Sequence, residues 1–125
     1  MKRLAALLLV AACSKGADKP APGSASARPQ PMGEVERQRG DDACQAYVDR
    51  LCKCADAQPP GDKEKDLEDR CQLKHGKLEA LQMTLQVDDD PKATARDVFI
   101  AQDQARKIIA RCIEENEALD QECPP

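Results

Sequence analysis

The sequence predicts an all-α protein, a small three-helix antiparallel bundle stapled by three disulfides. Apolar residues recur at spacings of three and four in three segments, and no segment alternates as a strand does. Aromatic residues make up only 2% of the 125 residues, so the hydrophobic core must be small. Six cysteines lie within residues 41–125, where disulfides can supply the stability that such a core lacks.

The first helix is expected after Asp41 and Asp42, either of which can cap it. Its apolar stripe consists of Cys44, Tyr47, Val48, Leu51, Cys52 and Ala55. The run Pro59-Pro60-Gly61 then breaks the chain, because neither proline can continue a helix.

The second helix is expected to be capped by Asp62 or Asp66. Its inward stripe is formed by Leu67, Cys71, Leu78, Leu81 and Leu85. Lys74 and Gly76 interrupt the pattern, so the middle of this helix is expected to be weak.

The third helix is expected to begin at Pro91 with Asp90 as its cap, and to run to about Leu119. Its inward residues are Val98, Ala101, Ala105, Ile108, Cys112 and Leu119, with Ile109 and Ile113 beside them. The acidic run at residues 88–90 lacks the glycine and the distal glutamate of a calcium loop, so helix capping explains it better. Tyr47 and Phe99 are too few for an aromatic binding surface and are interpreted as core residues.

The six cysteines of the folded part are interpreted as three disulfides, because the count is even and the domain is small. They are Cys44, Cys52, Cys54, Cys71, Cys112 and Cys123. Fifteen pairings are possible for six cysteines. Comparing heights along the helices favours Cys44 with Cys71, Cys52 with Cys112, and Cys54 with Cys123.

The amino terminus has the pattern of an export signal. Lys2 and Arg3 precede an apolar run from Leu4 to Ala12. A run of this length is too short to span a bilayer, which needs roughly 20 apolar residues. Residues 1–12 are therefore predicted to be a signal peptide rather than a membrane helix.

The sequence Val10-Ala11-Ala12-Cys13 resembles the lipobox of bacterial lipoproteins. The resemblance implies that residues 1–12 are removed and that Cys13 is acylated, so that it anchors the protein in a lipid bilayer. Ser14 stands where lipoproteins of the inner membrane commonly carry Asp. The resemblance therefore implies a cell-envelope location at the outer membrane, facing the periplasm or the cell surface.

Residues 13–40 are predicted to be a disordered tether, rich in Pro, Ser and Ala, that precedes the helical domain at 41–125. Residues 13–40 hold five Lys or Arg against three Asp or Glu, whereas 41–125 hold twelve against twenty. A domain with this acidic balance is not expected to bind nucleic acid, whose phosphates need a basic surface.

Few residues of the domain suggest catalysis. All serines lie in the tether, and His75 is the only histidine. Cys52, Cys54, Cys71 and His75 could together bind zinc or copper, although their spacing is unusual for a structural site. A redox role for the segment 52–54 is a further alternative, with Lys53 lowering a thiol pKa.

The function expected from these features is that of a membrane-anchored envelope lipoprotein, non-enzymatic and without a cofactor, that binds another envelope protein. The alternative is a periplasmic metal-binding protein that uses the three cysteines and the histidine named above. A third possibility is a protease or toxin inhibitor, which would present the loop at 56–62 or the tail from residue 120.

Overall fold

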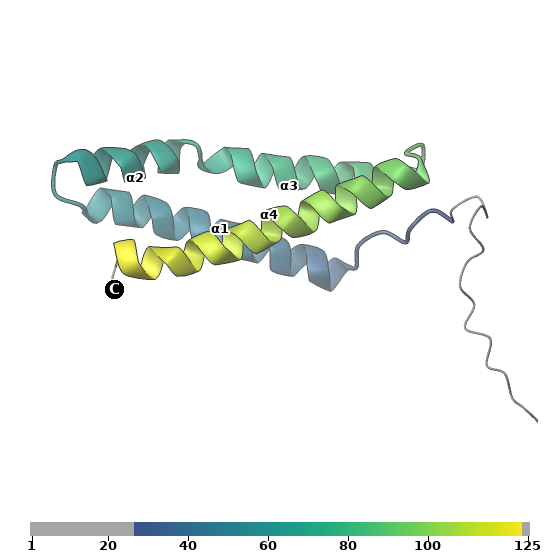
Figure 1. The fold of residues 1–125 in the computed structure, drawn as a ribbon, viewed down its shortest axis with the longest axis horizontal. Coiled ribbons are helices and arrows are strands. Elements are labelled where there is room, and N and C mark those ends of the chain that lie inside the picture. Colours follow the sequence, from purple (N-terminus) through teal and green to yellow (C-terminus); the bar gives the residue numbers. More distant parts are fainter. Residues whose placement is uncertain (1–26, 124–125) are drawn as a thin grey trace, which may run out of the picture.

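The computed structural model describes residues 27–123, and within them it contains helices and no strands. The helices are α1 (Glu34–Ala57), α2 (Asp62–Gln72), α3 (Lys74–Asp89) and α4 (Ala95–Glu122). α2 and α3 follow one another along one arm, while α1 and α4 run in the opposite direction (Figure 1). The predicted bundle of three antiparallel helical arms, stapled by disulfides, is confirmed.

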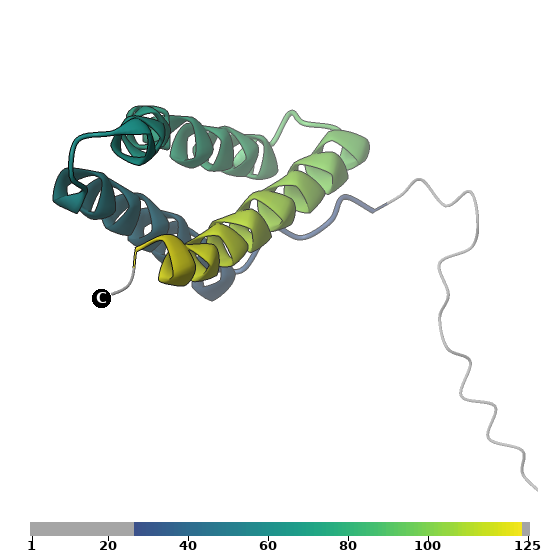
Figure 2. The ribbon, with the colours of Figure 1, turned by 60° about the vertical axis from the view of Figure 1, so that its left-hand side comes forward.

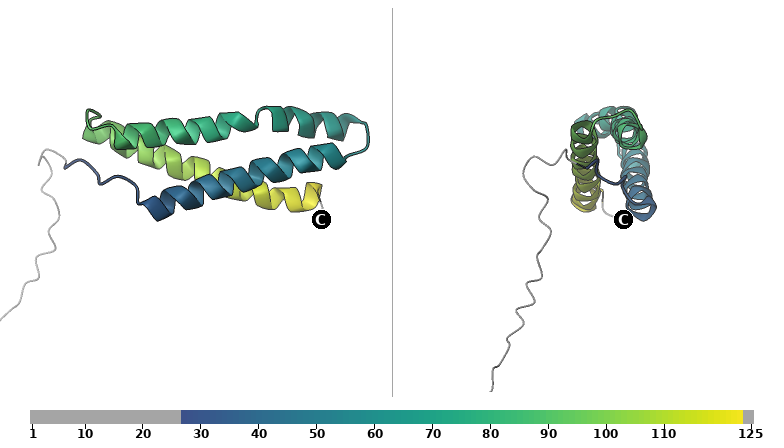
Figure 3. Two further views of the ribbon diagram at one scale, coloured as in Figure 1. Left: turned by 180° about the vertical axis from the view of Figure 1, so that it is seen from behind. Right: turned by 90° about the vertical axis from the view of Figure 1, so that its right-hand side faces the viewer.

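The three arms stand at the corners of a triangle when the bundle is viewed along its length (Figure 3). α4 lies close to α3 near the turn that joins them and moves away from the α2–α3 arm toward its carboxyl end (Figure 2). Each arm therefore has one face toward the other two arms and an outer face toward solvent.

The folded part begins earlier than residue 41. Residues 27–33 form a non-helical strap that packs against the bundle and buries Met32, and α1 begins at Glu34. The prediction of a tether over 13–40 is therefore wrong for 27–40, and residues 13–26 lie outside the described part. Composition misled here because specific polar contacts, rather than an apolar stripe, hold this segment to the bundle.

Asp41 and Asp42 consequently lie inside α1 and do not cap it. The cap position is Gly33, and acidic residues in the first turn interact favourably with the helix dipole. Gly40 packs tightly against α4, because a Cβ atom there would clash with the Ile109 side chain, including its Cγ1 atom at 2.7 Å.

The second arm is broken in its middle, as Lys74 and Gly76 indicate. α2 ends at Gln72 and α3 begins at Lys74, with the exposed Leu73 between them. Neither Asp62 nor Asp66 is the cap of α2. Gly61 takes that position, and its amide donates to the Glu64 carboxylate at 3.2 Å.

α4 begins at Ala95, four residues after the predicted start. Thr94 caps it, since the Asp97 amide donates to the Thr94 hydroxyl at 3.2 Å and the Thr94 amide donates to the Asp97 carboxylate. Asp90 instead holds the preceding turn, where its carboxylate accepts from the Lys92 amide at 2.8 Å. The Asp-Pro start signal was wrong because Thr94 and Asp97 form a reciprocal cap that Asp90 cannot match.

The core consists of two clusters. One packs α1 against α2 and the end of α4 and contains Tyr47, Val48, Leu51, Cys54, Ala55, Leu67 and Leu119. The other packs the strap and α1 against α3 and α4 and contains Met32, Cys44, Leu81, Ala105 and Cys112. The predicted stripes supply most of these residues. Phe99 was misassigned, because its side chain is 66% exposed.

The three disulfides join Cys44 to Cys112, Cys52 to Cys71, and Cys54 to Cys123, with Cα separations of 4.9, 5.0 and 5.8 Å. Only the last pair was predicted. The first and third link the parallel helices α1 and α4 at two levels, and the second closes the hairpin of α1 and α2. Together they tie the three arms into one covalent unit.

Candidate docking surface

An open apolar groove of about 860 Å³ lies between the outer faces of α3 and α4. α3 contributes Ala80, Met83, Thr84 and Val87, and α4 contributes Asp97, Ile100, Ala101, Gln104, Lys107, Ile108, Ala110 and Arg111. Met83 is 66% exposed and Ile100 is 42% exposed, so large apolar side chains face solvent there. We call this surface the α3–α4 groove.

The α3–α4 groove exists because α4 carries two apolar stripes. Val98, Ala105 and Cys112 follow one another at intervals of seven and face the core. Ile108 lies about 60° and Ile100 about 140° around the helix from the middle of that stripe, and both line the groove. The strap, α1 and α3 pack on the first stripe, whereas Ile108 is only partly buried against the core and Ile100 is exposed.

Charges lie toward the two ends of the α4 side of the groove. At one end, hydrogen bonds from the hydroxyl and the amide of Thr94 lower the pKa of Asp97, so this carboxylate is charged at neutral pH. At the other end, Arg111 has no ion-pair partner among the described residues, while nearby Lys77 pairs with Glu115. The α4 wall of the groove therefore carries a carboxylate, Asp97, at one end and two cations, Lys107 and Arg111, toward the other.

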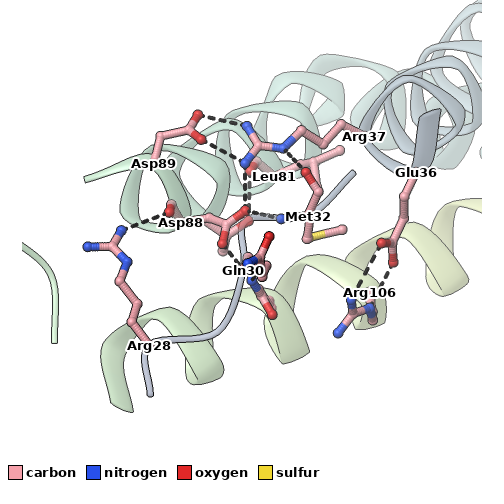
Figure 4. A network of polar contacts seen from close by, with 11 residues as sticks. Arg28, Gln30, Met32, Glu36, Arg37, Leu81, Asp88, Asp89 and Arg106 are labelled. Carbon is pink, nitrogen blue, oxygen red and sulfur yellow. Dashed lines mark hydrogen bonds and ion pairs between the residues drawn. The ribbon is translucent and has the colours of Figure 1, made fainter. Parts of the chain in front are cut away.

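A buried polar network holds the strap to the end of the groove near the α3–α4 turn (Figure 4). The Asp88 side chain, at the end of α3, is 1% exposed. Its carboxylate accepts from the Met32 amide at 2.8 Å, the Arg37 guanidinium at 2.6 Å and the Gln102 amide group at 2.7 Å. One buried charge thus joins the strap, α1, α3 and α4.

The more exposed part of the network adds further hydrogen bonds. Arg37 also donates to Asp89, and this hydrogen bond lowers the pKa of the Asp89 carboxyl. Arg28 donates to the Asp88 carbonyl at 3.1 Å, which places the start of the described chain beside the α3–α4 turn. The described part of the chain therefore starts at this end of the bundle.

A second, smaller groove of about 590 Å³ lies between α1 and α4. Val35 and Ile113 are exposed in it. The ion pair between Glu36 and Arg106 at 2.8 Å occupies one side, and the hydrogen bond from Arg106 lowers the pKa of Glu36. Because charged side chains interrupt its apolar surface, this groove is the weaker candidate.

The sequence-predicted site residues are distributed as follows. Cys13 lies outside the described residues, as does the signal peptide. The sulfurs of Cys52, Cys54 and Cys71 are all consumed in disulfides, two of them in the same one, so they cannot serve as the thiolate ligands that the metal alternative requires. The fourth proposed ligand, the His75 side chain, is outside the described part. Among the described residues, no group of three His, Cys, Asp or Glu side chains is placed to hold a metal.

The α3–α4 groove was not predicted from the sequence. The signal that could have found it was the width of the apolar face of α4, since Ile100 cannot share one narrow stripe with Val98 and Cys112. The strap was not predicted either, and Met32 is its only large apolar residue.

No protein-family model, curated protein or solved structure significantly matches this chain. Among the described helices, none has the length and apolar character to cross a bilayer.

Proposed function

We propose that this protein is a lipid-anchored lipoprotein of the cell envelope, attached at the outer membrane through acylated Cys13. Its helical domain acts as a non-enzymatic module that binds a protein through the α3–α4 groove. The observation that carries the binding role is the exposure of Met83, Val87 and Ile100 on one continuous surface. Exposed apolar surface of this kind is typical of interaction sites.

An anchor at Cys13 is compatible with a groove that remains accessible to a partner. The described chain starts at the α3–α4 turn, where Arg28 is held, so an anchor at Cys13 would place this end toward the membrane. On its composition, the segment between Cys13 and Arg28 would behave as a flexible coil with a reach of about 20 Å. That reach would leave the groove accessible to a partner above the membrane surface.

The disulfides also support this role. A docking surface gains affinity when its two walls are fixed before binding. Cys44–Cys112 ties α4 to α1, and Cys52–Cys71 ties the second arm to the same helix. The two helices that form the groove are therefore held indirectly through α1 in an oxidising compartment.

Anchoring is tested by Cys13→Ser in the full chain, followed by membrane fractionation and intact mass measurement. We expect the natural chain in the membrane fraction, with the added mass of its acyl groups, and the variant without that mass. Equal partitioning of both chains, with no acyl mass on the natural one, would contradict the proposed anchor.

Binding is tested by amine-reactive crosslinking of the tagged full chain in intact cells. Met83→Glu with Ile100→Glu places charge on the groove and should abolish the crosslinked complex, because both side chains are exposed and the core is untouched. Val35→Glu is the matched control, since it charges an exposed apolar residue outside the groove and should leave the complex intact. Loss of the complex in the control alone, or absence of any complex, would refute the proposed role of the groove.

A further inference from the structure

We propose that the partner in the α3–α4 groove is a second copy of this chain, docked with its α4 antiparallel to the first around a twofold axis at Gln104. The proposal rests on the proposed role of the groove and names its occupant. Two chains would then form a four-helix contact in which each α4 fills the groove of the other.

The order of side chains along α4 is self-complementary about Gln104. In two antiparallel helices related by a twofold axis at residue 104, a residue n positions before 104 faces the residue n positions after it. Asp97 and Arg111 are each seven positions from Gln104, and Ile100 and Ile108 are each four. Opposite charges therefore meet at both ends, and isoleucines meet between them.

The five residues also share one face of the helix. Intervals of three, four and seven positions return to nearly the same side of an α-helix. All five line the α3–α4 groove, and Gln104 lies at its middle. From Asp97 to Arg111 the helix spans about 21 Å, which is four turns of contact. Gln104 can pair with its own copy, because an amide group both donates and accepts.

The charges are available for this contact. One oxygen of the Asp97 carboxylate accepts from the amide and the hydroxyl of Thr94, which lowers the pKa of Asp97, and the side chain is exposed. Arg111 is exposed and has no carboxylate partner in the described part of the chain. Lys107 would face Ala101 of the second copy, where its aliphatic stem packs while its ammonium stays with Asp103 of its own helix at 2.6 Å.

α3 completes the contact. Met83 and Val87 lie on the other wall of the groove, so the second α4 would rest between α3 and α4. By symmetry, the first α4 contacts the α3 of the second copy, which covers both exposed surfaces at once. A partner of different sequence would cover only one of these two exposed surfaces.

The test places a photoreactive benzoylphenylalanine at position 104 of the full chain in intact cells, with a second variant at position 83. Gln38, an exposed glutamine on α1, is the matched control position. We expect a crosslinked product of twice the chain mass from positions 104 and 83, in which both peptides come from this protein, and no such product from position 38.

Arg111→Glu in the position-104 chain should reduce this product about tenfold, because both symmetry-related pairs change from attraction to repulsion. Arg111→Lys should retain most of it. Circular dichroism of the variants checks that the helices are unchanged.

A crosslink from positions 104 and 83 to a different protein would overturn the second-copy proposal and leave the docking role of the groove intact. Absence of any crosslink at both positions would overturn the two together. Equal dimer yield from position 38, or a yield unaffected by Arg111→Glu, would refute the antiparallel arrangement.

Discussion

Asp88 is the residue on which the packing of the strap depends. Its buried carboxylate accepts hydrogen bonds from the strap, α1 and α4, and the donors come from positions 32, 37 and 102. A buried carboxylate is stable only when such partners replace the water it has lost. The short distances and three separate donors meet that condition here.

Asp88→Asn should lower the free energy of unfolding by about 2–3 kcal/mol, because the new NH₂ group faces donors and leaves one of them unpaired. Asp89→Asn, at the neighbouring residue, is the matched control. It removes a charge from an exposed side chain and should change stability by less than about 0.5 kcal/mol. Urea unfolding followed by circular dichroism measures both. Equal losses in the two variants would mean that Asp88 is not the centre of the network.

Gly40 is a position where α1 packs tightly against the Ile109 side chain of α4. Gly40→Ala should lower the free energy of unfolding by about 1 kcal/mol, because its methyl group must displace the Ile109 side chain, including the carbon next to Cβ. Gly76→Ala meets no atom within 4 Å and should instead raise stability by about 0.5 kcal/mol through better helix propensity. Thermal melts of the two variants should shift in opposite directions. If Gly40→Ala stabilised the protein instead, α1 and α4 would be farther apart at Gly40 than in this structure.

At the scale of elements, two residues are candidates for the cap of α4: Thr94, which caps it in the structure, and Asp90, which the sequence pattern favours. Thr94→Ala should cost about 1 kcal/mol, because it removes the hydroxyl that accepts from the Asp97 amide. Asp90→Ala should cost less than half as much, since Asp90 only bonds within the preceding turn. Denaturant midpoints compare the two. The reverse order would place the helix start at Pro91.

The helices themselves were predictable because each arm has an apolar stripe, and Leu51, Leu81 and Leu119 are buried as their spacing indicates. The strap and the first turns of α1 were not, because ion pairs and one buried carboxylate hold them. Such contacts leave no periodic pattern in a sequence. The α3–α4 groove was not predicted for a related reason. The sequence shows that α4 has a wide apolar face, but only the packing of the helices determines which part of that face stays exposed.

Two disulfides were mispaired in the sequence-based prediction, although the spacing of the cysteines indicates which of them lie at the same height on neighbouring helices. Cys52 and Cys71 stand nine residues before and ten after Gly61 (61 − 52 and 71 − 61), so they meet across an antiparallel hairpin. In the parallel helices, the interval from Cys44 to Cys54 is ten and that from Cys112 to Cys123 is eleven. Nearly equal intervals make two rungs between α1 and α4, as observed.

For the whole molecule, covalent bridges supplement a small core. Each disulfide contributes about 3 kcal/mol, so the three together are comparable with the total stability of a small domain. Reduction should therefore convert the cooperative thermal transition into a broad one at much lower temperature, or abolish it, as seen by circular dichroism. The oxidised protein in the same buffer is the control. An unchanged melting temperature after complete reduction, verified by thiol counting, would contradict this dependence.

The account depends most on the parallel register of α1 and α4, because that register leaves the outer faces of α3 and α4 uncovered as a docking surface. Peptide mapping of the unreduced full chain by mass spectrometry measures it directly. We expect linked peptides that join Cys44 to Cys112, Cys52 to Cys71, and Cys54 to Cys123. Linkage of Cys44 to Cys71 with Cys52 to Cys112 would contradict the register and the groove that follows from it.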